Sequence, residues 1–136
     1  MHNTMNKSQN LSMNNTVLSG LQEHGFSGKA GFDKSIFSVT RIDAIRFIIR
    51  THLVTIKHIS TSSSAYSYSL KHLIERYAYV TQEPILGNYV KNGECIYAMY
   101  LEGFMVKPEA DGKNAYFNVS QKSVDVLRSV VSKLDH

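Results

Sequence analysis

The chain has 136 residues, a hydrophobic fraction of 43% and a formal net charge of +4 at neutral pH. This length and composition fit a single domain with one core, so a second domain is not expected. A membrane-spanning helix needs roughly 18 consecutive apolar residues. The most apolar stretch here, residues 47–49, is flanked by Arg46 and Arg50, so the sequence excludes such a span.

The N-terminal residues lack the basic start, apolar centre and small-residue cleavage site of a secretory signal, so we expect a cytoplasmic protein. Cys95 is the only cysteine, which excludes an internal disulfide and fits a reducing compartment. Residues 1–16 are rich in Asn and have little to bury. They are predicted to be a disordered tail in front of one α+β domain over 17–136, with Met1, Met5 and Met13 as alternative starts.

The positive charge is concentrated in residues 41–80, where six basic residues face two acidic ones. Residues 1–40 carry three bases and two acids, and residues 81–136 carry six bases and seven acids. A basic middle third has two interpretations, one of which is contact with the phosphates of nucleic acid. The alternative interpretation is a solvated face that keeps the protein in solution.

Residues 17–21 are expected to form a short helix, followed by a glycine-rich loop. Apolar residues at spacings of three and four then predict a helix over about 41–58, with Thr40 as its N-cap and Asp43 at the third position of a capping box. The β-branched run over 54–59 leaves open that this helix ends near His52 and that a short strand follows.

A serine-rich linker, 60–64, precedes a second predicted helix over about 65–79, which Ser64 would cap. A third helix is predicted to begin at its cap Asn92 and to stop at Gly103. Segments 104–107 and 115–119, joined by a turn at 111–112, predict a β-hairpin. Ser120 is expected to cap a last helix. The predicted fold class is α+β: three helices followed by a β-hairpin and a C-terminal helix.

This order of elements is the order of a winged helix-turn-helix, in which one helix enters the major groove of DNA and the hairpin contacts the backbone. The helix that begins at Asn92 would be the reading helix. However, the loop before it has about a dozen residues instead of three or four, and the helix contains two glutamates and no arginine. Contact with phosphates through the first two helices is therefore favoured over base reading.

The candidate nucleic-acid-binding residues are basic, hydroxyl or amide side chains on or beside these helices. They are Arg46, Arg50, Lys57, Ser63, Lys71, His72, Arg76, Lys91 and Asn92. The chain also contains eight tyrosines and no tryptophan. Tyrosines among basic residues stack on unpaired bases or anchor protein interfaces. Tyr68 and Tyr97 are the better interface candidates, whereas Tyr66 and Tyr77 lie at helical spacing with leucines and are expected in the core.

Signals for catalysis are weak. No two histidines stand four residues apart and Cys95 has no second cysteine, so no metal or cofactor is expected. Cys95 in a first helical turn is far more often a buried small residue than a nucleophile. His72 and Glu75 share a helix face, but such pairs are common on surfaces. The sequence therefore predicts a protein that is not an enzyme.

Several segments between Tyr66 and Ser120 resemble short uncharacterised proteins of bacterial mobile elements, of the plasmid and prophage type. They are residues 69–75, 89–94, 103–104 and 114–120. This resemblance implies no known activity. Gly103 and Phe104 after a helix are also similar to HicA-type toxins, which cleave RNA. The turn at 112–114 has no histidine where that family carries its catalytic one, so the nuclease activity is not carried over.

The function predicted from the sequence is a small non-catalytic accessory protein that contacts the phosphates of DNA or RNA through a basic helical face. The alternative is a protein–protein interaction module, either a homodimeric adaptor or an inhibitor of a host complex, that uses a tyrosine-bearing surface. A ribonuclease that depends on His72 or Cys95 is a third hypothesis.

Overall fold

Two β-hairpins and four α-helices make up the computed structural model, which describes residues 17–110 and 112–135. The predicted tail over 1–16, and Asp111 in the predicted turn, lie outside the described residues. The helices are α2 (Val39–His52), α3 (Ser67–Val80), α4 (Asn92–Leu101) and α5 (Gln121–Leu134). The antiparallel hairpins are β1 (Leu21–Gln22) with β2 (Gly25–Phe26), and β3 (Val106–Pro108) with β4 (Ala115–Phe117). Short 3₁₀ turns cover Lys34–Ile36 and Ser63–Ala65.

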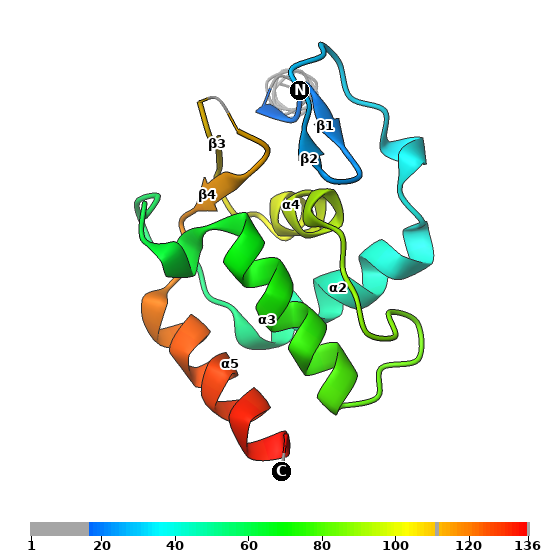
Figure 1. Cartoon of the computed structure of the whole chain (residues 1–136). Helices are drawn as coiled ribbons and strands as arrows, with labels where there is room; N and C mark the ends of the chain where they lie inside the picture. Colours follow the sequence, from blue (N-terminus) through cyan, green and yellow to red (C-terminus); the bar gives the residue numbers. More distant parts are fainter. Residues whose placement is uncertain (1–16, 111, 136) are drawn as a thin grey trace, which may run out of the picture.

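The predicted α+β class and the order of helices, hairpin and C-terminal helix are confirmed. Figure 1 shows α4 near the middle of the molecule, with α3 crossing in front of it and α5 packed beside α3. The hairpin β1–β2 lies over α4, and α4 also contacts α2 and β3. No described helix is both long and apolar enough to cross a bilayer.

Helix α4 forms the centre of the core. Seven of its ten residues are buried, among them Cys95, Ile96 and Met99. A helix that is apolar on most sides must be covered by other elements. In a winged helix-turn-helix the reading helix lies on the surface, so the corresponding helix of this chain cannot enter a groove of DNA. Any contact with nucleic acid has to come from the first residues of α4 or from other elements.

Helix α2 begins and ends differently from the main sequence prediction. Its N-cap is Ser38, whose hydroxyl accepts the Arg41 N–H at 3.3 Å, so the predicted capping roles of Thr40 and Asp43 are wrong. The helix ends at His52, as the alternative prediction stated. The chain is then extended because the Ile56 N–H donates to the Asn118 carbonyl at 2.8 Å and Thr55 forms a bridge with Val119.

The caps of the other helices were predicted with mixed success. Ser120 caps α5 by accepting the Ser123 N–H at 3.1 Å, and Gly103 follows α4 with a φ of +89°, as expected. Ser64 does not cap α3, because it is buried in the preceding 3₁₀ turn and Tyr66 occupies the cap position. Asn92 is the first residue of α4 and not its cap. Its side chain donates to the hairpin β1–β2 instead, at the His24 carbonyl.

The expected short helix over 17–21 is also wrong. Leu21 pairs with Phe26, and Gln22 pairs with Gly25, in the hairpin β1–β2. The Phe26 N–H donates to the Lys113 carbonyl at 2.9 Å, which ties this hairpin to the loop before β4. Strands of two residues have no measurable periodicity, so tertiary contacts, and not local propensity, decide the structure here.

Candidate nucleic-acid interface

Arg46 and Arg50 lie next to each other on α2, as the helical spacing predicted, but their charge is partly neutralised. Both bind Glu102 at the end of α4: Arg46 Nε lies 2.6 Å from Oε2, and Arg50 Nε lies 3.0 Å from Oε1. The pKa of Glu102 lies below its ordinary value, mainly because of the hydrogen bonds from Arg50. Burial of the carboxylate raises the pKa, but the two arginines together outweigh this effect. The arginine pair therefore acts first as a structural contact between α2 and α4.

The lowered pKa of Glu102 predicts a dependence of stability on pH. A carboxylate whose folded pKa lies below its ordinary value of 4.5 contributes stability that is present above that value and disappears as the pH falls through the folded pKa. We expect Glu102→Gln to lower the free energy of unfolding by about 2 kcal/mol at pH 7 and by much less near pH 3. Thermal denaturation from pH 7 to pH 3 measures this difference.

Asp125→Asn is the matched control for Glu102→Gln. Asp125 pairs with Arg128 at 3.3 Å on the surface of α5, and both side chains are well exposed. Exposed pairs contribute little, so this variant should differ from the wild type by less than about 1 kcal/mol at either pH. If Glu102→Gln lowers the free energy of unfolding as much at pH 3 as at pH 7, the assigned role of Glu102 is wrong.

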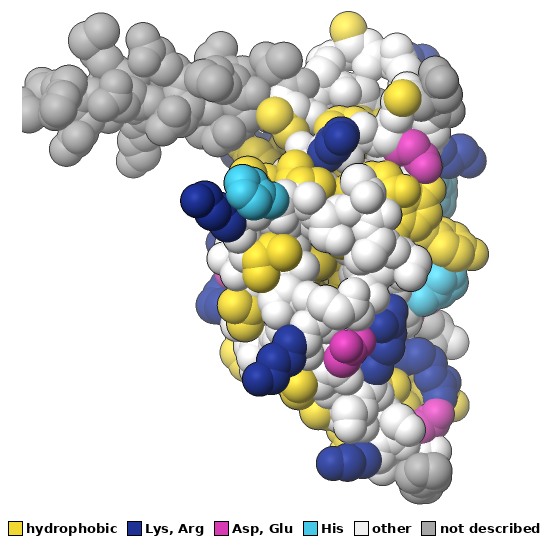
Figure 2. Space-filling model, turned by 90° about the vertical axis from the view of Figure 1, so that its left-hand side faces the viewer, with side chains coloured by type: hydrophobic (Ala, Val, Ile, Leu, Met, Phe, Trp, Pro, Cys, Tyr) yellow, Lys and Arg dark blue, Asp and Glu magenta, His cyan; other side chains and the backbone are white. Residues whose placement is uncertain are grey.

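Lys57 and Ser63 lie apart from the other candidates, whereas Arg76 follows His72 on α3 and lines a cavity together with it. Lys57 and Ser63 are exposed, in the segment after α2 and in the 3₁₀ turn before α3, and neither side chain has a hydrogen-bond partner in the described part of the chain. Arg76 binds the Asp135 carboxylate at the end of α5 and lies over the Tyr79 ring, 5.6 Å from its centre. On the face shown in Figure 2, the Lys and Arg side chains are scattered and separated by other types, so this face carries no continuous basic patch.

Lys71 and His72 on α3 share the carboxylate of Glu75. Lys71 Nζ lies 2.9 Å from Oε2, and His72 Nδ1 lies 3.0 Å from Oε1. The second contact is the one between His72 and Glu75 that their shared helix face predicted. The Val90 N–H also donates to Oε2, at 2.8 Å. Burial opposes ionisation of Glu75, but these hydrogen bonds outweigh it and lower its pKa. Glu75 thus holds Lys71 in place beside the segment that leads into α4.

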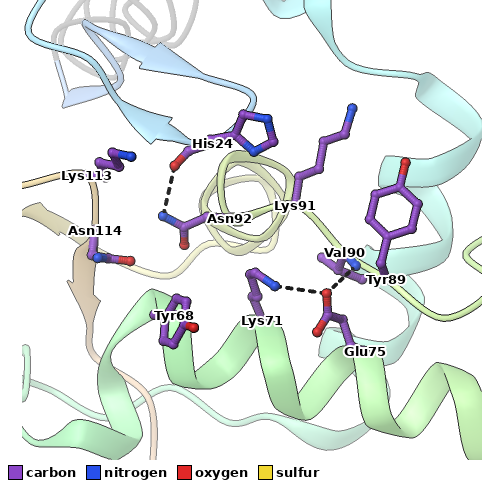
Figure 3. Close-up of a pocket in the computed structure, with 10 residues that line it drawn as sticks. All are labelled: His24, Tyr68, Lys71, Glu75, Tyr89, Val90, Lys91, Asn92, Lys113 and Asn114. Atoms are coloured by element: carbon purple, nitrogen blue, oxygen red, sulfur yellow. Dashed lines mark hydrogen bonds and ion pairs between the residues drawn. The ribbon is translucent and has the colours of Figure 1, made fainter.

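Three lysines from separate parts of the chain line one cavity of about 540 Å³, which we call the lysine cavity. They are Lys71 from α3, Lys91 at the start of α4 and Lys113 from the loop before β4 (Figure 3). His24 from the β1–β2 turn lines it as well. The structure thus brings together three of the predicted residues, Lys71, Lys91 and Asn92, with residues that the sequence analysis did not select.

The lysine cavity has an excess of positive charge. Its lining contains three lysines and one carboxylate, which belongs to Glu75. Lys91 also binds Glu23 outside the lining, 2.6 Å from Oε1, and this hydrogen bond raises the pKa of Lys91. Lys113 has no ion-pair partner among the described residues. The lysine cavity therefore has the charge and the donors that a phosphate group requires.

Asn92 contributes an unpartnered acceptor to the wall of the lysine cavity. The residue is only 7% exposed, and its Nδ2 donates weakly to the His24 carbonyl at 3.4 Å. Its Oδ1 is buried and has no hydrogen-bond partner within the described residues. Figure 3 shows this oxygen pointing away from His24, toward the side of the cavity where Tyr68 and Lys71 lie. A buried acceptor without a donor is unusual and indicates a position where a donor can be supplied.

Two exposed tyrosines flank the lysine cavity. Tyr68 on α3 is 53% exposed and Tyr89 before α4 is 48% exposed, and both belong to the lining. The Tyr68 ring contacts the His72 ring edge-on, 4.3 Å between centres, and the Arg41 guanidinium lies 4.8 Å from the centre of the Tyr89 ring. Tyr97, the other predicted interface tyrosine, is half-buried and stacks on Phe37 at 5.2 Å.

The sequence analysis missed His24, Tyr89, Lys113 and Asn114 as members of this site. They come from loops and turns whose positions depend on the hairpins, and no local pattern in the sequence marks them. Among the described residues there is also no cluster of His, Cys, Asp and Glu that could hold a metal ion. Cys95 is fully buried, and burial raises the pKa of its thiol to about 12, so it is not an activated nucleophile.

Comparisons with known proteins give no information about function, so any functional argument has to start from the candidate site. No protein-family model matches the chain, and neither the curated proteins nor the solved structures contain a significant match. The resemblances to mobile-element proteins and to HicA-type toxins therefore stay predictions. The fold is α+β, and the function has to be inferred from the residues that the structure brings together.

Proposed function

We propose that this chain binds nucleic acid without catalysis and contacts phosphates through the lysine cavity and the adjoining face of α3. The observation that carries this proposal is that Lys71, Lys91 and Lys113 line one cavity together with the exposed rings of Tyr68 and Tyr89. A positively charged groove with aromatic side chains is the usual arrangement of proteins that bind nucleic acid through its backbone and bases.

The proposal moves the interface away from α2. Arg46 and Arg50 share Glu102, so a phosphate would have to compete with a carboxylate at less than 3.2 Å. In the lysine cavity, Lys71 and Lys91 are paired as well, with Glu75 at 2.9 Å and with Glu23 at 2.6 Å. Lys113 faces no competing carboxylate among the described residues, so it is the lysine of this site that a phosphate reaches without displacing a partner. His72 and Arg76 extend the basic face along α3, where both line a second cavity together with Tyr79.

A pair of lysine variants tests the location of the interface. We expect Lys71→Ala combined with Lys113→Ala to weaken binding of a labelled oligonucleotide. The slope of log K against log salt should also become shallower, by about 1 for each phosphate that the variant no longer neutralises. Fluorescence anisotropy over 50 to 200 mM salt, with single-stranded and duplex DNA and RNA, measures both quantities.

The matched control is Lys122→Ala combined with Lys133→Ala, which removes the same charge from exposed positions on α5. It should leave the slope nearly unchanged. Equal effects of both lysine pairs would show unspecific attraction to a cationic surface and would contradict the proposed site. A larger effect of Arg46→Ala and Arg50→Ala would place the interface on α2 instead.

A second candidate function is the binding of a protein partner through α2. Val39 is 74% exposed and Phe47 is 64% exposed, and large apolar side chains at such exposure are typical of interaction surfaces. Val39, Phe37, Ile42 and Leu101 form the apolar part of the lining of a cavity of about 460 Å³, which Asp43 and Arg46 line as well. Absence of nucleic-acid binding, together with a dimer in light scattering, would favour this function over the first.

A further inference from the structure

The shape of the lysine cavity restricts what can enter it. Four segments surround it: the β1–β2 turn, α3, residues 89–92 and the loop before β4 (Figure 3). Its volume of about 540 Å³ lies within the range of roughly 300 to 1,000 Å³ that is usual for small-ligand pockets. In a duplex the bases are paired and stacked inside a cylinder, so only phosphates would reach the mouth of such a recess. A nucleotide of a single strand can turn its base inward.

The two flanking tyrosines fit an unpaired base. Tyr68 and Tyr89 come from different elements and are each about half exposed. Contacts already hold both rings in position: His72 at the edge of Tyr68, and Arg41 over Tyr89. Exposed aromatic rings stack on bases that are not engaged in pairing, and rings that are held in place lose less freedom when they do so.

The polar groups of the cavity include hydrogen-bond donors and an acceptor, and both kinds fit a nucleotide. Lys71, Lys91 and Lys113 carry ammonium groups that can donate to phosphate oxygens, whereas Asn92 Oδ1 can only accept. A cavity that bound inorganic anions alone would not need a buried acceptor. A nucleotide carries phosphate oxygens and also amino or hydroxyl donors, so it satisfies both kinds of group.

We propose that the lysine cavity receives one nucleotide of a single-stranded nucleic acid, with its phosphate on the lysines and its base against Tyr68 or Tyr89. This inference rests on the proposed function and adds to it the strand type. It also assigns Tyr68 and Tyr89 as binding residues and gives the unpartnered Oδ1 of Asn92 a donor on the ligand.

The test compares a labelled single-stranded oligonucleotide of 12 nucleotides with a duplex of the same sequence at equal salt, by fluorescence anisotropy. We expect the single strand to bind at least about tenfold more tightly, since stacking on even one ring contributes about that factor. Tyr68→Leu and Tyr89→Leu should each weaken the single strand about tenfold and leave the duplex nearly unchanged. Tyr68→Phe keeps the ring and should retain binding.

Phe47→Leu is the matched control, because Phe47 is an exposed aromatic residue of α2 that lines neither the lysine cavity nor the second cavity on α3. Equal affinity for duplex and single strand, or a Tyr68→Leu variant that binds like the wild type, would overturn the inference and leave the proposed function standing. If a nucleoside 5′-monophosphate at the same concentration as the oligonucleotide displaced it, the assignment of a single strand as the ligand would be overturned. If neither the single strand nor the duplex binds, the proposed function itself fails.

Discussion

Replacing Gly93 by alanine is expected to lower the free energy of unfolding by about 3 kcal/mol and the melting temperature by roughly 10 °C. A Cβ at this position would lie 1.9 Å from the Gln22 carbonyl oxygen and 2.6 Å from that of Glu23. Both atoms belong to the backbone, so no side-chain rotation can make room. The Gly93 N–H also donates to the Glu23 carbonyl at 2.8 Å, and the hairpin β1–β2 would have to move away from α4.

Gly103→Ala provides the control for Gly93→Ala at the other end of α4. It adds the same methyl group where no atom lies within 4 Å, so only the positive φ of +89° opposes it. That conformation costs about 1 kcal/mol for a residue with a side chain. Urea and thermal denaturation measure both variants. If Gly93→Ala is no less stable than Gly103→Ala, the close contact between α4 and the hairpin is wrong.

Arg41→Met is expected to destabilise the fold by about 3 kcal/mol, because it leaves the Glu94 carboxylate buried without a counter-charge. Glu94 is only 3% exposed. Arg41 Nε lies 2.8 Å from its Oε2 and Nη2 lies 2.9 Å from its Oε1, and Nη2 also donates to the Tyr89 carbonyl at 3.1 Å. This one arginine therefore connects α2, the start of α4 and the segment that carries Tyr89.

A double variant separates the effect of the buried charge from the effect of side-chain packing. Glu94→Gln removes the charge and keeps an oxygen that can accept the Lys91 N–H, which now donates to Oε1 at 2.9 Å. In the Arg41→Met background it should therefore recover part of the stability, so that the two changes are not additive. Additive destabilisation in chemical denaturation would show that Arg41 contributes through packing alone.

The helices could be predicted from the sequence because each of the longer ones has a clear periodic face. In α2, Ile42, Ile45 and Ile49 are buried as the spacing of three and four required. The C-terminal boundary of α2 was ambiguous, because β-branched residues after His52 tolerate both helix and extended chain. The partner that decides it, Asn118, is more than sixty residues away in the sequence.

The candidate site was only partly predictable. Lys71 and His72 were selected because they lie on one face of a helix, and Lys91 because it begins the next helix. The neutralisation of Arg46 and Arg50 was not predictable, since no local pattern indicates that Glu102 reaches both. In the same way, Lys113 joins the cavity from a loop whose backbone is bound to the β1–β2 hairpin by the hydrogen bond from the Phe26 N–H, and no local pattern indicates this contact.

The measurement that tests the central claim most directly is an NMR titration of the ¹⁵N-labelled chain with a single-stranded oligonucleotide. The proposed site predicts that the largest shifts occur around the lysine cavity, at Tyr68, Lys71, Asn92 and Lys113. Residues of α2 around Phe47 should change little. If the largest chemical-shift changes occurred on α2, the assignment of the lysine cavity as a nucleic-acid interface would be contradicted. The same holds if no chemical shift changed at millimolar oligonucleotide and low salt.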